Sequence, residues 1–93
     1  MIEKVVVTGM GALTPVGLSV EESWDSLLAG KSGAGQIRQF DASQFPVRIA
    51  CELPEFDVEA FIDKREARKM DAHTQYGVAA SLMAWKDAGI AEG

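Results

Sequence analysis

The fold of this chain depends on a stretch near its N-terminus, which reads Val5-Val6-Val7-Thr8-Gly9-Met10-Gly11-Ala12-Leu13-Thr14-Pro15-Val16-Gly17. Three consecutive β-branched residues favour an extended backbone, and the lack of polar alternation predicts that both faces of the strand are buried. We therefore expect a central strand over residues 4–8. The glycines and the Thr-Pro step that follow predict a tight turn before any helix can begin.

Composition limits the possible functions. With 93 residues, of which 47% are hydrophobic, the chain can form at most one small domain. A net charge of -5 argues against general binding to nucleic acid or to an anionic membrane surface. Because Gly9 and Gly11 interrupt the apolar run, we expect neither a signal-peptide core nor a membrane span. The sequence predicts a soluble chain with no nucleic-acid or membrane partner.

The single cysteine, Cys51, cannot form an internal disulfide, and the chain lacks the paired Cys/His spacing of a zinc site. This composition fits a reducing compartment, so we expect a cytoplasmic location and neither a metal nor a cofactor. A thiol with a lowered pKa could act as a nucleophile, but the alternating pattern around Cys51 predicts a small apolar core residue instead. His73, the only histidine, is expected at the surface or partly packed.

Helix signals recur along the chain. Ser19 and Glu22 form a capping box ahead of apolar residues at helical spacing, and Gly30 suits a left-handed C-terminal position. These features predict a helix that begins after Ser19 and ends near Ala29. Strand, turn and helix would form a first α/β unit, and the small and polar residues 31–40 are expected to form a loop.

The second half predicts one strand and further helices. Residues 47–53 alternate apolar and polar side chains between two prolines, which predicts a half-exposed edge strand. Asp57 can cap one short helical turn and Asp63 another, so two short helices or one bent helix fit equally well. The longest helix is expected from Asp71 to Ala88, closed by Gly89, and its largely apolar or small-residue surface is typical of a helix inside a larger body.

Two glycine motifs resemble nucleotide-binding signatures. A dinucleotide fingerprint needs a third glycine where this chain has Thr14, and Pro15 delays the helix that should follow. The triplet Gly30-Lys31-Ser32 imitates the end of a phosphate-binding loop, but Asp25 occupies the position of its first glycine. We therefore rank a dinucleotide-binding enzyme third among the possible functions.

The sharpest candidate site is a basic cluster, which we define as Lys64, Arg65, Arg68 and Lys69. At about 100° per residue these side chains form one stripe covering less than half of a helix. Residues 64–69 carry a net charge of +3, which leaves -8 elsewhere in the chain. Such a local excess can attract an acidic partner, although it can also be a solvated face paired with Asp63 and Glu66.

Several clusters together resemble a known family: Val5 to Gly11, Thr14-Pro15-Val16-Gly17, Trp24, Leu27 to Gly33, Arg68-Lys69-Met70-Asp71, Gln75-Tyr76-Gly77 and Asp87-Ala88-Gly89. In this order they resemble the N-terminal part of a β-ketoacyl-acyl carrier protein synthase. The likeness is strongest to the type II enzymes of bacterial fatty acid synthesis. It covers nearly the whole chain in one register.

This resemblance implies a thiolase-like fold, a layered α/β arrangement with buried helices, which is usually homodimeric. Residues 1–93 would be the N-terminal segment of its first half and no complete domain. The family condenses an acyl thioester with malonyl carrier protein by decarboxylative Claisen chemistry in fatty acid elongation. That chemistry needs an activated thiol and donors to the developing oxyanions.

The catalytic cysteine, histidines and lysine of the family lie beyond the matched segment, and neither Cys51 nor His73 aligns with them. No catalytic residue is therefore expected here, and the chain alone is expected to be inactive. The resemblance also implies that the basic cluster, Lys64, Arg65, Arg68 and Lys69, helps to dock acyl carrier protein. A non-catalytic α/β module that binds acyl carrier protein is the alternative.

Overall fold

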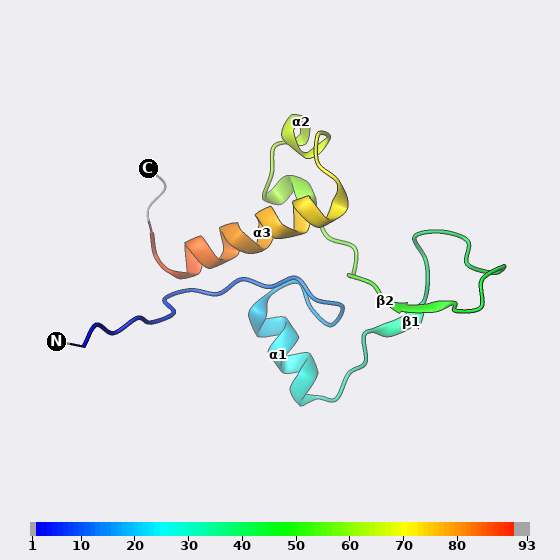
Figure 1. Ribbon diagram of the computed structural model, residues 1–93, viewed down its shortest axis with the longest axis horizontal. Helices are drawn as coiled ribbons and strands as arrows, with labels where there is room; N and C mark the ends of the chain where they lie inside the picture. Colours follow the sequence, from blue (N-terminus) through cyan, green and yellow to red (C-terminus); the bar gives the residue numbers. More distant parts are fainter. Residues whose placement is uncertain (1, 91–93) are drawn as a thin grey trace. The chain divides into compact units, whose positions relative to one another are not determined.

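A computed structural model describes residues 2–90 (Figure 1). The elements along the chain are α1 (Val20–Leu28), β1 (Ala34–Gln36), β2 (Ile49–Cys51), a 3-10 turn η1 (Val58–Ala60), α2 (Lys64–Ala67) and α3 (Ala72–Asp87). They belong to two compact units. Unit 1 combines the N-terminal segment up to Ala12 with the chain from Asp57 onward, and unit 2 is Leu13–Phe56.

The N-terminal segment differs from its prediction, because residues 4–8 do not form a strand. Val5 is 94% exposed and Val7 80% exposed. A strand needs a neighbour that accepts its N–H groups and donates to its carbonyls. Among residues 2–90 the only ladder joins β1 to β2, so this segment has no strand to pair with and its apolar side chains stay uncovered.

The Gly9-Met10-Gly11 step packs against α3 within unit 1, and Figure 1 shows this segment running along the helix. A Cβ atom added at Gly11 would overlap the carbonyl oxygen of Ala80, and one added at Gly9 would overlap that of Ala84. The backbone can approach this closely only because glycine has no side chain. These glycines therefore serve helix packing.

Small residues on α3 make the same contact possible from the other side. Ala84 and Ala88 both lie against Gly9, and their small side chains permit the close approach of the N-terminal backbone. Gly77 has no neighbour within 4 Å of an added Cβ, so it plays no part in this contact. Within residues 2–90, Ala79 is the one buried residue of α3 and Trp85 is 47% exposed, so this segment alone does not supply the larger body expected around the helix.

The core of unit 1 lies where η1, α2 and α3 meet, and its buried side chains are Ile62, Ala67 and Ala79.

Of the two alternatives for residues 57–69, two short helical turns are observed. Asp57 caps the first, accepting the N–H of Glu59 at 3.1 Å. Asp63 occupies the N-cap position of α2 but makes no capping hydrogen bond with its side chain.

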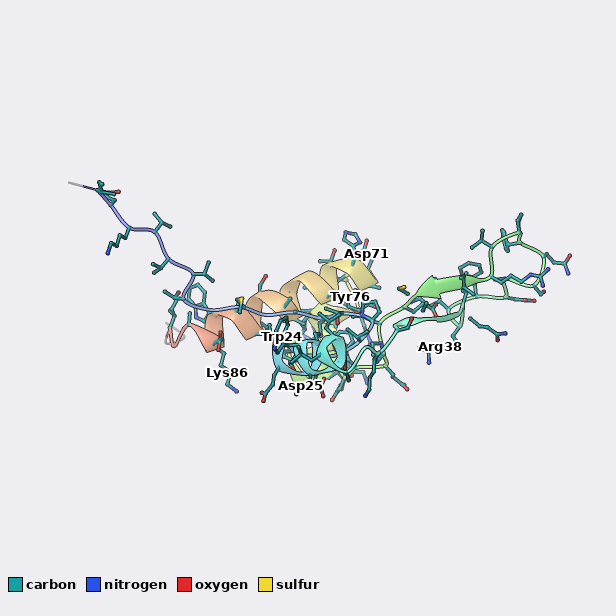
Figure 2. All side chains as sticks on the ribbon, turned by 90° about the horizontal axis from the view of Figure 1, so that it is seen from below. Trp24, Asp25, Arg38, Asp71, Tyr76 and Lys86 are labelled. Carbon is teal, nitrogen blue, oxygen red and sulfur yellow. The ribbon has the colours of Figure 1, made fainter. Side chains whose placement is uncertain are left out.

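Helix α3 has the predicted ends. Asp71 is its N-cap, and Gly89 beyond the C-terminus has a φ of 72°, a left-handed conformation that favours glycine. Figure 2 shows Asp71 at one end of the helix and Lys86 near the other. These two charges complement the helix dipole, whereas Asp87, the last residue of α3, opposes it.

Helix α1 in unit 2 confirms the predicted capping signals. Ser19 accepts the N–H of Glu22 at 3.0 Å, and Glu22 in return accepts the N–H of Leu18 at 2.8 Å, one residue before the cap. Gly30, with a φ of 72°, follows the helix end. The cap therefore satisfies two backbone donors at the start of the helix.

Two buried serines of α1 hold the preceding turn. Ser23 Oγ lies 2.7 Å from Thr14 Oγ1, and Ser26 Oγ donates to the carbonyl of Val16 at 2.7 Å. These serines are the buried residues of α1, whereas its larger apolar side chains, Trp24, Leu27 and Leu28, are 59–69% exposed.

The hairpin corrects two predictions. Residues 31–40 are not entirely loop, because Ala34–Gln36 forms β1 and pairs antiparallel with β2. The predicted strand over 47–53 is shorter, Ile49–Cys51, and Cys51 is exposed and not a core residue. All three residues of each strand are exposed, so this two-stranded sheet buries neither set of side chains.

Candidate functional site

The basic cluster lies on α2 and the turn that continues it. All four side chains, Lys64, Arg65, Arg68 and Lys69, are exposed. The helical path extends past α2, since Arg68 N–H donates to the Lys64 carbonyl at 3.2 Å and Lys69 N–H to the Glu66 carbonyl at 3.1 Å. At about 100° per residue the four cations occupy an arc of about 140°. The structure therefore brings them together as the sequence predicts.

The opposite side of α2 fixes this orientation. Ala67 is 5% exposed and forms part of the core of unit 1. Gln75 on α3 donates its Nε2 hydrogen to the Ala67 carbonyl at 3.0 Å and lies 3.5 Å from the Met70 carbonyl. Ala67 is the last residue of α2, and its carbonyl also accepts the N–H of Met70 at 3.1 Å, so the amide of Gln75 adds a second donor at the end of the helix. Gln75 thus secures the end of the helix and directs the cations outward.

The sequence places Gln75 in one of the clusters that resemble the family, but it does not predict the hydrogen bond from Gln75 to the end of α2. The residue sits among polar and small neighbours at the start of α3, and its acceptor lies eight residues earlier. The turn between α2 and α3 brings the amide to that carbonyl. No local signal in the sequence indicates this contact.

The cations differ in their partners. Lys69 Nζ lies 3.4 Å from Glu66 Oε1 in a surface ion pair. Within residues 2–90, the side chains of Lys64, Arg65 and Arg68 make no hydrogen bond or ion pair. Three cations in one exposed arc are therefore available to an external acidic group.

Next to this cluster, the N-terminus of α3 carries a small polar network. Asp71 Oδ1 accepts the hydroxyl of Thr74 at 2.6 Å and its N–H at 3.2 Å, and His73 Nδ1 lies 3.1 Å away. The Thr74 hydroxyl and then its N–H stabilise the carboxylate and lower the pKa of Asp71 below its usual 3.8. The His73 side chain is 85% exposed, which confirms its predicted surface position.

Unit 2 contains an open cleft of about 540 Å³ beside the hairpin. Its charged lining residues include Arg38 and Glu52, which bind each other: Arg38 Nε lies 3.6 Å from Glu52 Oε1. Glu52 also accepts the N–H groups of Arg38 and Gln39 at 2.9 and 3.2 Å. Figure 2 shows Arg38 beside the sheet. These groups brace the hairpin loop.

Across residues 2–90, no three His, Cys, Asp or Glu side chains are placed to hold a metal ion. In the same region, no helix combines the length and apolar character needed to cross a membrane. The basic cluster is therefore the candidate functional site.

Comparison with known proteins agrees with the predicted family. The family model described as "Beta-ketoacyl synthase, N-terminal domain" matches residues 2–93. The "3-oxoacyl-[acyl-carrier-protein] synthase 2" of Vibrio cholerae is 51% identical over 87 residues, which are 94% of this chain and 21% of that protein. The protein of the same name in Coxiella burnetii is 42% identical over 87 residues, with the same two shares covered.

A solved structure shows the same arrangement. "The ishigamide ketosynthase/chain length factor" matches with a TM-score of 0.85 and 41% sequence identity, over 94% of this chain and 22% of that one. The chain thus spans about a fifth of the length of the relatives it matches. Its fold is the α/β N-terminal part of a thiolase-like ketosynthase fold, as the resemblance implied. By sequence and by fold, this chain belongs to the β-ketoacyl synthase family, within the N-terminal domain.

Proposed function

We propose that this chain is the N-terminal segment of a 3-oxoacyl-[acyl-carrier-protein] synthase. Such an enzyme condenses an acyl thioester with malonyl carrier protein by decarboxylative Claisen chemistry in fatty acid elongation. The support is 51% identity to a protein of that name over nearly the whole chain. On this proposal, residues 1–93 open the first of two thiolase-like halves, and the catalytic groups lie in the other four-fifths of the enzyme.

The contribution of this segment would be to dock acyl carrier protein. The observation that carries this proposal is the exposed arc of Lys64, Arg65 and Arg68, whose side chains are unpaired within residues 2–90. Carboxylates on an acidic carrier would find complementary charge there, and each guanidinium can bind a carboxylate in bidentate fashion. Opposite charges on two surfaces also accelerate association and select the partner.

Two further features belong to the same proposal. The full-length enzyme would act in the cytoplasm, where the single Cys51 can remain reduced. It would act as a homodimer, because closed two-fold assembly is the commonest state of soluble oligomers. Neither feature is needed for the docking role of α2.

A chimaera tests the enzymatic part. This chain would replace the matching 87-residue segment of the Vibrio cholerae relative, and condensation of malonyl and acyl carriers would be assayed. Activity within an order of magnitude of the parent is expected, because the catalytic groups come from the parent. A chimaera that folds and has the same molecular mass in solution as the parent, but lacks condensing activity, would contradict the proposal.

Carrier titration tests the docking part. Replacing Arg68 and Lys69 with Glu in the 93-residue chain, and separately in the chimaera, should weaken binding most strongly at low salt. The matched control reverses Lys4 and Lys31, two exposed cations outside the cluster, and changes the net charge equally. Equal affinities for the two double variants at low ionic strength would contradict a docking role.

A further inference from the structure

Residues 64–69, which carry the basic cluster, include one acidic residue, Glu66, which reduces their net charge to +3. On an ideal α-helix, at about 100° per residue, Glu66 would lie about 60° beyond Lys69, at the edge of the basic arc, and the 3-10 turn after α2 reduces this separation. Its side chain is 56% exposed, and Asp71 beyond the turn is exposed as well. Glu66 therefore faces the same solvent region that an acidic partner would enter.

The backbone brings Glu66 and Lys69 together. Lys69 N–H bonds to the Glu66 carbonyl at 3.1 Å, and Met70 N–H bonds to the Ala67 carbonyl at 3.1 Å. Both are hydrogen bonds between residues three apart, typical of a 3-10 turn, in which side chains at this spacing eclipse. The Glu66 and Lys69 side chains are consequently aligned, with 3.4 Å between Oε1 and Nζ.

We propose that Glu66 is an intramolecular competitor for Lys69 that limits how tightly the basic cluster holds the carboxylates of acyl carrier protein. This inference rests on the proposed docking function of α2. A carrier would first meet the unpaired Lys64, Arg65 and Arg68. To engage Lys69, a carrier carboxylate would then have to displace Glu66 and approach its negative charge.

The exposure of the pair determines the size of this effect. Lys69 and Glu66 side chains are 67% and 56% exposed, so water screens their attraction and an external carboxylate can exchange with Glu66. Docking would then stay readily reversible, which an enzyme needs when it exchanges one carrier for another in each cycle. Glu66 would thus tune affinity and leave the choice of partner to the other cations.

The test compares Glu66→Gln with the unchanged chain by titration with acyl carrier protein. We expect binding about two- to five-fold tighter at low ionic strength, in line with the strength of an exposed pair. This gain in affinity should shrink at about 1 M salt, where the Debye length falls to about 3 Å. The control is Glu59→Gln, which removes an equal charge from an exposed residue of the same unit and should change affinity less.

A second pair of variants isolates the competition. In a Lys69→Gln background, Glu66→Gln should bring less gain than in the parent, because no Lys69 remains to be released. Circular dichroism of each variant checks that helical content is retained, and the chimaera serves if a variant of the chain does not fold. Unchanged or weaker binding by Glu66→Gln, or a gain matched by Glu59→Gln, would overturn the inference. If the unchanged chain and the chimaera both fail to bind the carrier, the proposed docking function fails, and this inference fails with it.

Discussion

The backbone N–H of Met10 donates to Oδ2 of Asp87 at 3.0 Å, linking the start of the chain to the last residue of α3 across 77 positions. Met10 lies between Gly9 and Gly11, the two glycines that bring the N-terminal backbone against the same helix. The hydrogen bond therefore fixes the register of the Gly-Met-Gly step along α3.

Replacing Asp87 with Ala removes the acceptor for Met10. We expect the free energy of unfolding to fall by about 0.5–1.5 kcal/mol, the usual net contribution of one hydrogen bond. A negative charge at a helix C-terminus is itself unfavourable, which offsets part of the loss. Asp87→Asn keeps an acceptor and removes that charge, so it should match the parent in urea unfolding. An equal loss for both variants would contradict this role.

Gly11→Ala places a Cβ atom against the Ala80 carbonyl, which belongs to the helix backbone and cannot move independently. We expect a loss of about 1–3 kcal/mol, typical of an overpacked site. Gly77→Ala on α3 is the matched control, because an added Cβ there meets nothing within 4 Å. That variant should gain about 0.5–1 kcal/mol from better helix propensity. Thermal unfolding would compare the two, and similar destabilisation by both would refute the packing role of Gly11.

Gln75→Ala removes the amide that bonds to the Ala67 carbonyl. We expect the unfolding free energy to fall by about 1 kcal/mol and carrier affinity to fall with it, as the end of α2 loosens. The salt dependence of the remaining binding should not change, because no charge is lost. Ser81→Ala, which removes a hydrogen bond within α3, should affect stability but not affinity. Loss of affinity in both variants would show that Gln75 does not act specifically on α2.

The stability that Asp71 gives to the N-terminus of α3 should decrease as the pH falls in the acid range. Because hydrogen bonds from Thr74 lower the pKa of Asp71 below 3.8, the carboxylate stabilises the fold fully above that value. The contribution disappears as pH falls through the lower pKa of the folded state. Thr74→Val should return the pKa of Asp71 towards 3.8, which carboxyl NMR titration would measure. The stability difference between the parent and Asp71→Ala should narrow below pH 3.8, and a constant difference would argue against this linkage.

Local signals in the sequence predicted the helices well. Ser19, Asp57 and Asp71 each cap the helix or turn that follows, and Gly30 and Gly89 each adopt the left-handed conformation beyond a helix end. A cap depends on residues two or three positions apart, so the chain itself carries the required information. The spacing of the basic cluster was predictable as well, because its four residues lie within six positions of one another.

Contacts between distant residues decided the rest. Ala34–Gln36 has no strand signature and is a strand only because Ile49–Cys51 pairs with it, whereas residues 4–8 have a strong signature but no partner among residues 2–90. The sequence by itself determined which residues carry positive charge and at what spacing. Tertiary structure decided which way they face, because the burial of Ala67 and the bond from Gln75 orient α2. A backbone pair or a packed face needs a second segment, and no local sequence pattern specifies which segment that is.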